Sequence, residues 1–375
     1  MTLTERLARL AKVRGDSTPV VSVYLNTRWK DEHQREHTRT FLKTELKRAR
    51  QGHPGEGLAD ALDWVQSQGE ALLTGAPEPD TFGVALFACP AVGLREVIPV
   101  HVPFEEAFVV AATPFLRPLA AALGEAPPAL VVFVDGESAR LIPMLPDQAS
   151  EEVRLDSAVP GRHRRGGWAQ LAESRYRRHI EDRRDRHFEA VAETLSRLVE
   201  EYAVERVVLA GEPGTVAALR KALPAPMVRR VAGTVTAARH EPASLIVTRA
   251  ATAIAEIGGR ETRAAVDEAL GDDAGGGKAA AGLEPVLDAI GRGAVHRLYV
   301  LREFHEPGRV CAGCDGIQPG GEPTCRRCGR PTMAAELGDA MVDRVLAAGG
   351  SVTLVAAHDG LGRAGGVVAR LRFPL

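Results

Sequence analysis

The chain has 375 residues, of which 45% are hydrophobic and 26% charged, and its net charge is −2. This composition is typical of a folded protein with two or three cores and excludes a disordered chain. No apolar run approaches the roughly 20 residues of a membrane span. The opening "MTLTERLARLAKVRGD" is an amphipathic helix pattern broken by charges and differs from a signal peptide. We therefore expect a cytoplasmic protein without a membrane segment.

The first 128 residues are predicted to form an α/β domain. After the opening helix, the apolar run Pro19–Thr27 predicts a strand. Helices are expected at Glu32–Arg50 and Leu58–Leu73, followed by strands at residues 82–89 and 94–102. The first of these two helices is basic. Both a second anion-binding surface and an ordinary solvated helix face fit that charge, and the sequence leaves the two interpretations open.

Residues 129–262 are predicted to form a middle domain with alternating strands and helices. "ALVVFVDGESARLIPM" predicts two strands joined by a turn at Asp135 and Gly136. "AVERVVLAGEPGTVAALRKAL" predicts a strand, a Gly/Pro turn and a helix. The turn lacks the spacing of the Gly-x-Gly-x-x-Gly and Walker phosphate-binding loops, so it is interpreted as a plain connection.

A strongly basic segment lies between these two parts of the middle domain. Residues 161–188 hold nine arginines against four acidic residues, a net charge of +5 in a chain of net charge −2. Such a local excess on an acidic body indicates contact with a polyanion such as RNA. The alternative is a solvated helix face held by i,i+4 ion pairs.

The apolar spacing of this basic segment changes along its length. From Phe188 to Tyr202 the apolar residues recur every three or four positions, which predicts a helix that packs on a core. From Ala169 to His187 the apolar residues are too few for a buried stripe. We therefore expect one long helix whose first half leaves the domain body, with the loop Gly166, Gly167 and Trp168 at its far end.

The third region, residues 263–375, contains the most specific motif. "CAGCDGIQPGGEPTCRRCGR" places Cys311, Cys314, Cys325 and Cys328 in two Cys-x-x-Cys pairs on Gly- and Pro-rich turns. Four thiolates with this spacing predict a structural zinc site, a zinc ribbon at 311–328, with no open position for catalysis. The alternative is a disulfide or redox pair. The fifth cysteine, Cys89, is expected to be a buried apolar residue.

Other patterns in this region also predict alternating structure. "VHRLYVLREF" predicts a strand before the cysteines, and "AAELGDAMVDRVLAAGG" predicts a helix after them. "SVTLVAA" and "GGVVARLRF" predict the closing strands. The Gly-rich residues 271–282 are expected to form a flexible loop or linker. The whole chain is thus predicted to be a mixed α/β protein of three α/β domains, with a protruding basic helix and an inserted zinc ribbon.

Taken in order, these segments resemble the eukaryotic and archaeal class I peptide-chain release factors and their ribosome-rescue relative Pelota, in particular the bacterial members of that superfamily. The resemblance covers nearly the whole chain. It rests on "FVDGESARLIPM", on the basic segment from Arg162 to Leu195, and on "RVVLAGEP", "VLDAIGRGAVHRLYV", "CAGC…CRRC" and "GGVVARLRF". The basic segment resembles the family's Gly-Gly-Gln loop and following helix.

The resemblance implies a factor that enters the ribosomal A site. In the family the middle-domain loop reaches the peptidyl transferase centre beside P-site peptidyl-tRNA, while the basic helix lies along ribosomal RNA. This implies rRNA binding by the arginines of the segment: Arg162, Arg164, Arg165, Arg175, Arg177 and Arg178. It also implies a translation GTPase partner of the EF-Tu type. We expect the protein to be a monomer.

The chain departs from the family at the position that matters for catalysis. Trp168 follows Gly166 and Gly167 where the family has glutamine, and indole offers a stacking face but no hydrogen-bond acceptor. Gln170 lies two residues further on. It is interpreted either as the catalytic group of a codon-independent peptidyl-tRNA hydrolase or as part of the first helical turn. The stop-codon signatures Asn-Ile-Lys-Ser and Tyr-x-Cys-x-x-x-Phe are absent.

We therefore expect a ribosome-binding factor for rescue, stress protection or hibernation without stop-codon decoding. One alternative is the hydrolase acting through Gln170. The other is a zinc-ribbon interaction protein that acts away from the ribosome, on another RNA or on an acidic partner.

Overall fold

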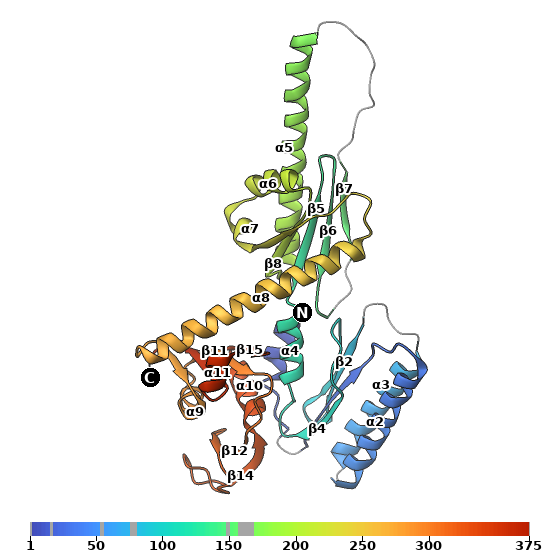
Figure 1. Cartoon of the computed structure of the whole chain (residues 1–375). Helices are drawn as coiled ribbons and strands as arrows, with labels where there is room; N and C mark the ends of the chain where they lie inside the picture. The colour runs from blue at the N-terminus through green and yellow to red at the C-terminus, as the bar shows by residue number, and fades with distance from the viewer. Residues whose placement is uncertain are drawn as a thin grey trace. The chain divides into compact units, whose positions relative to one another are not determined.

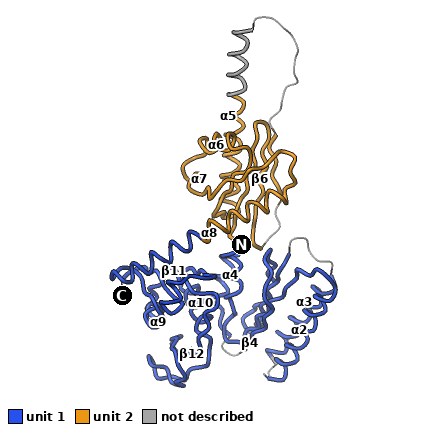
Figure 2. Tube along the Cα trace, in the orientation of Figure 1, with its two compact units in different colours: residues 1–125, 260–375 blue, residues 126–259 orange. Residues whose placement is uncertain are grey.

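The computed structural model describes residues 2–15, 18–52, 56–75, 81–147, 151–156 and 169–374, with the backbone alone at 56 and 169–181. It divides into two compact units (Figure 2). Unit 1 combines Met1–Glu125 with Arg260–Leu375, and unit 2 is Ala126–Gly259. Among the described helices, none has the length and apolarity needed to cross a membrane.

The first part of unit 1 is built on an antiparallel sheet of four strands (Figure 1). In spatial order these are β3 (Leu94–Val100), β2 (Gly83–Cys89), β1 (Val20–Asn26) and β4 (Ala107–Ala111). All seven residues of β2 and the first six of β1 are buried. Both faces of this sheet are therefore covered, which explains why these strands are almost continuously apolar.

Helices from the first part of the chain cover the two faces. On one face lie α2 (Glu32–Gly52) and α3 (Glu56–Thr74), which contribute Leu42 and Leu62 to a shared core. The other face is covered by α1 (Leu3–Leu10) and α4 (Arg117–Glu125). A capping box between Thr2 and Glu5 satisfies backbone N–H groups at the start of α1.

The last part of unit 1 contains a second sheet and a small ribbon. The sheet has the order β10 (Ala279–Ala281), β16 (Val367–Leu371), β11 (Val295–Leu301) and β15 (Ser351–Val355). The ribbon has the order β13 (Ile317–Pro319), β12 (Pro307–Cys311) and β14 (Thr332–Glu336). Its helices are α9 (Leu283–Gly291), α10 (Leu337–Ala347) and α11 (Asp359–Arg363).

Unit 2 is a five-stranded mixed sheet. Its order is β7 (Val153–Asp156), β6 (Ser138–Met144), β5 (Ala129–Val134), β8 (Arg206–Gly211) and β9 (Val231–Val235). β5 and β6 form the predicted hairpin, and the Asp135 carboxylate accepts hydrogen bonds from the backbone N–H groups of Glu137 and Ser138 in its turn. β8 runs parallel to both β5 and β9, and the chain passes through at least one helix between each of these parallel pairs.

Helices also cover both faces of the unit 2 sheet. One face packs against α5 (Ala169–Glu201), α6 (Pro213–Ala222) and the short α7 (Ala225–Arg230). The other packs against the first part of α8 (Ala243–Ala274), through side chains such as Ile246 and Ile254. The predicted mixed α/β class is therefore confirmed.

One prediction for this part of the chain is wrong. The Gly-rich residues 271–282 do not form a loop throughout, because α8 continues to Ala274 and β10 begins at Ala279. Val266 and Ala269 bury apolar area in the C-terminal core, which keeps the helix formed in spite of its Gly and Asp residues. The predicted boundary at 262/263 falls within this helix, so the division into three domains stays a prediction.

Candidate metal centre and the arginine-rich helix

The four predicted ligand cysteines lie together at the end of the ribbon. The Sγ atoms of Cys311, Cys314, Cys325 and Cys328 are all within 4.8 Å of one another. The sulfurs of Cys311 and Cys328 are 3.5 Å apart, as are those of Cys314 and Cys325. A disulfide needs about 2.05 Å, whereas two sulfurs on a tetrahedral zinc ion are separated by about 3.8 Å. The four cysteines therefore fit a metal ion better than disulfides.

The backbone around the cysteines also favours metal ligation. The Gly313 N–H points at the Cys311 sulfur, at 3.3 Å. Backbone N–H groups of Cys328 and Arg327 lower the pKa of Cys325 to about 6. The Gly316 N–H also favours the thiolate of Cys314, but the Cys328 sulfur and burial raise the pKa of Cys314 to about 12. Metal ligation needs thiolates, so a divalent cation bound by the four sulfurs would displace the protons of the cysteine thiols.

The second Cys-x-x-Cys turn is held by Gln318, a residue that the sequence analysis did not single out. Its side chain is buried, and its Oε1 accepts a hydrogen bond from the Arg326 N–H at 2.9 Å. Its Nε2 donates to the carbonyl of Thr324 at 3.0 Å. Gln318 therefore fixes both sides of Cys325, the role that second-layer residues have in metal sites. In the sequence, the only hint of this role was the position of Gln318, a polar residue between the two cysteine pairs.

The arginine-rich helix α5 has 33 residues, so at about 1.5 Å per residue it is about 50 Å long. Its predicted packing register is confirmed: Phe188, Val191, Leu195, Leu198 and Val199 are all buried in the core of unit 2. The stretch before Phe188 is charged and partly open to solvent, and Arg184 and Arg186 are exposed there. Helix α5 is therefore anchored to unit 2 by its C-terminal half.

Several predicted site residues lie outside the described residues or in the stretch described by its backbone alone. Those outside are Gly166, Gly167, Trp168, Arg162, Arg164 and Arg165. Gln170 is the second residue of α5, and Arg175, Arg177 and Arg178 also belong to this helix. Their roles stay predictions.

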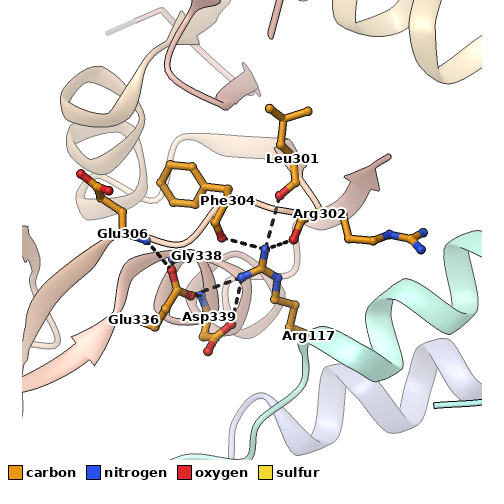
Figure 3. A network of polar contacts seen from close by, with 8 residues as sticks. All are labelled: Arg117, Leu301, Arg302, Phe304, Glu306, Glu336, Gly338 and Asp339. Carbon is orange, nitrogen blue, oxygen red and sulfur yellow. Dashed lines mark hydrogen bonds and ion pairs between the residues drawn. The ribbon is translucent and has the colours of Figure 1, made fainter. Parts of the chain in front are cut away.

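A second arginine site was missed by the sequence analysis. Arg117, the first residue of α4, is only 6% exposed. Its guanidinium contacts the carboxylates of Glu336 and Asp339 at 3.3 Å each, as Figure 3 shows. It also donates to three carbonyl groups, those of Leu301, Arg302 and Phe304. The lone arginine before a proline gave no local signal, because its partners lie 184 to 222 residues later.

The middle of the chain matches a known family. Residues 114–256 match the family described as bacterial archaeo-eukaryotic release factor family 10. This segment contains α4, the whole sheet of unit 2, α5 and the first part of α8. None of the curated proteins compared matches the chain.

Solved structures of archaeal and yeast factors are also similar to the chain. An archaeal Pelota, in a ribosome-bound model with ABCE1, is 17% identical over 100% of this chain and 95% of that chain, with a TM-score of 0.42. Dom34 of S. cerevisiae is 11% identical over 76% and 74%, with a TM-score of 0.39. The archaeal translation termination factor aRF1 is 17% identical over 100% and 99%, with a TM-score of 0.26. The family likeness of this chain therefore lies in residues 114–256, which are similar to the bacterial archaeo-eukaryotic release factor family 10.

Proposed function

We propose that this protein binds the vacant A site of the ribosome and acts in rescue, stress protection or hibernation without reading stop codons. The observation that carries the proposal is the release-factor family match over residues 114–256, because that segment contains the arginine-rich helix α5. The factor is cytoplasmic, and a translation GTPase of the EF-Tu type is its expected partner.

The charge and anchoring of α5 support an RNA-binding role. Residues 161–188 carry a net charge of +5, and each arginine that neutralises a phosphate releases a counterion on binding. The helix is held in unit 2 from Phe188 onward, and Arg184 and Arg186, shortly before that residue, are exposed and do not belong to the core. These two arginines are described members of the basic segment 161–188.

The altered tip supports binding rather than ordinary hydrolysis. In our proposal Gly166 and Gly167 let the backbone pass close to RNA, and Trp168 stacks on a base. Indole has one hydrogen-bond donor and no acceptor, so it cannot position a water molecule as the family's glutamine does. Gln170 is the second residue of α5, which is consistent with the interpretation that it belongs to the first helical turn.

The test is sedimentation with ribosomes whose A site is either empty or filled by tRNA, at near-physiological salt. We expect the protein to pellet only with the empty ribosomes. Reversal of Arg164 and Arg165 to glutamate should weaken this binding at least about tenfold, since two phosphate contacts are lost. The matched control reverses Arg220 and Lys221, an exposed basic pair on α6 of the same unit. Equal pelleting of both variants would contradict the proposal.

Peptide release from stalled ribosomes separates binding from hydrolysis. We expect no release by the wild-type protein. Release that disappears in Gln170→Ala while pelleting is unchanged would instead make the protein a codon-independent hydrolase. Absence from both pellets, with zinc bound at the cysteines, would favour an interaction protein that acts away from the ribosome.

A further inference from the structure

Helix α10 lies between the candidate metal centre and the first part of the chain. We infer that α10 couples the four-cysteine site to the docking of the first segment (residues 2–125) on the last segment (residues 260–374), so that loading the site with metal tightens this docking. The inference does not depend on the proposed function. It rests on two lines of contacts within unit 1 that connect the cysteines with the first segment.

The first line runs along the ribbon sheet. Strands β12 and β14 pair so that Cys311 lies opposite Thr332 at one end of the ladder and Pro307 lies opposite Glu336 at the other. Arg309 on β12 also donates to the Thr332 hydroxyl, at 2.6 Å. Metal ligation by Cys311 would therefore fix the register of a ladder that ends at Glu336.

Glu336 is the point where the ribbon meets α10 and the first segment. Its carboxylate caps the helix by accepting hydrogen bonds from the N–H groups of Gly338 and Asp339, at 3.0 and 2.7 Å. It also accepts from the Glu306 N–H at 2.9 Å and pairs with the buried guanidinium of Arg117 (Figure 3). One carboxylate thus sets the start of α10 and holds α4 of the first segment.

The packing at this point leaves little freedom. A Cβ atom added at Gly338 would lie 2.9 Å from Nη1 of Arg117 and 3.0 Å from the Glu336 carboxylate. The lack of a side chain at Gly338 therefore allows the guanidinium and the Glu336 carboxylate to lie close to the start of α10. A shift of the ribbon end would break hydrogen bonds to a buried charge, which are costly to lose.

The second line runs directly from the cysteines to α10. Asp315 follows the ligand Cys314 and pairs with Arg344 of α10 at 2.6 Å. The next residue toward the start of that helix, Asp343, accepts a hydrogen bond from the Thr113 hydroxyl of the first segment at 3.1 Å. At the end of the helix, Leu346 and Ala347 pack against the first segment's core. Both ends of α10 therefore contact the first segment.

The experiment is amide hydrogen exchange on the full chain, loaded with Zn²⁺ alone or stripped by a chelator. We expect metal removal to speed exchange in α4, residues 117–125, by about tenfold or more, because buried charge-assisted hydrogen bonds are lost. Strands β5 and β8 of unit 2 serve as the internal reference and should not change. Faster exchange in 307–336 with unchanged α4 would overturn the inference. If exchange in β1 and β2 became faster by the same factor as in α4, the inference would also be overturned, since the first segment would then be unfolding rather than undocking.

Two variants test the route. Glu336→Gln should still bind zinc stoichiometrically. In this variant, the difference in the amide exchange rate of α4 between zinc-loaded and stripped protein should be smaller than in the wild type. Arg344→Met, which removes the pair with Asp315, is the second variant and should also reduce it. The matched control is Arg302→Met, which breaks an exposed ion pair with Glu125 of α4. The Arg302 side chain lies on neither line, and its backbone carbonyl still accepts from Arg117 in this variant. If removal of the metal speeds exchange in α4 as much in both test variants as in the wild type, the coupling is contradicted.

Discussion

Two helices of this chain carry arginines in opposite environments. Arg117 of α4 is 6% exposed and surrounded by oxygen atoms of its own chain, two carboxylates and three carbonyls. Arg184 and Arg186 of α5 are exposed on a helix whose packing does not use them. A buried arginine must have its partners within the protein, whereas an exposed one is available to a partner molecule. Arg117 therefore has an architectural role, whereas the exposed arginines of α5 are those to which we propose an RNA-binding role.

The largest effect is expected from the loss of Arg117. Arg117→Met should lower the free energy of unfolding of unit 1 by about 3 to 5 kcal/mol, because Glu336, Asp339 and three carbonyls would lose a buried partner. Denaturant titration, followed by a probe in unit 1, measures this change. A loss below about 1 kcal/mol would mean that water replaces the guanidinium and that the comparison with α5 is wrong.

The acidic groups near Arg117 predict a pH dependence of the same unit. Burial raises the pKa of Asp339 to about 7, with a further contribution from Glu336, and burial raises the pKa of Asp343 to about 8. Thr113, Arg14 and Arg344 oppose the shift at Asp343, and Asp339 adds to it. The folded state therefore holds protons that the unfolded state has already released above about pH 4.

The sign follows from these raised pKa values. Their contribution to stability is complete below the pKa of the unfolded chain and is lost as the pH rises through 7 and 8. We expect unit 1 to lose roughly 1 to 3 kcal/mol between about pH 5 and pH 8. Asp343→Asn should flatten this slope. Denaturant midpoints measured between these pH values test the prediction. A pH dependence of stability that is the same in the wild type and in Asp343→Asn would contradict it.

The arginines of α5 should show the opposite behaviour. Reversal of Arg184 and Arg186 to glutamate should change the free energy of unfolding of unit 2 by less than about 0.5 kcal/mol, because neither side chain contributes to the core. Affinity for ribosomal RNA should fall about tenfold and its salt dependence should weaken. Thermal unfolding and a salt titration of binding measure the two effects. A stability loss with unchanged binding would reverse the assignment.

The smallest effect is expected from an exposed arginine at the same contact as Arg117. Arg302 pairs with Glu125 at 2.5 Å, but both side chains are more than 40% exposed. Arg302→Met should therefore cost about 0.5 kcal/mol or less. Its backbone carbonyl, which accepts from Arg117, is kept. A cost similar to that of Arg117→Met would show that position at the contact, rather than burial, determines the effect.

Much of the local structure could be predicted from the sequence. The hairpin at Asp135, the packing of α5 from Phe188 onward and the approach of the four cysteines all follow from short spacings. The hairpin and the helix packing depend on residues that are close in the chain, and the metal centre depends on four residues of the same type. The extension of α8 to Ala274 was not predicted, since a distant core stabilises residues whose helix propensity is low.

The sequence by itself thus determined the α/β elements, the basic segment and a candidate metal centre, because periodicity, charge and cysteine spacing are local properties. Only the tertiary structure decided that the first and last segments share one compact unit and that Arg117 joins them. Its partners come from β11, β14 and α10 or the residues beside them, and no spacing in the sequence connects these with α4. Burial of a charge is a property of the folded whole, which explains why this site was visible only in the structure.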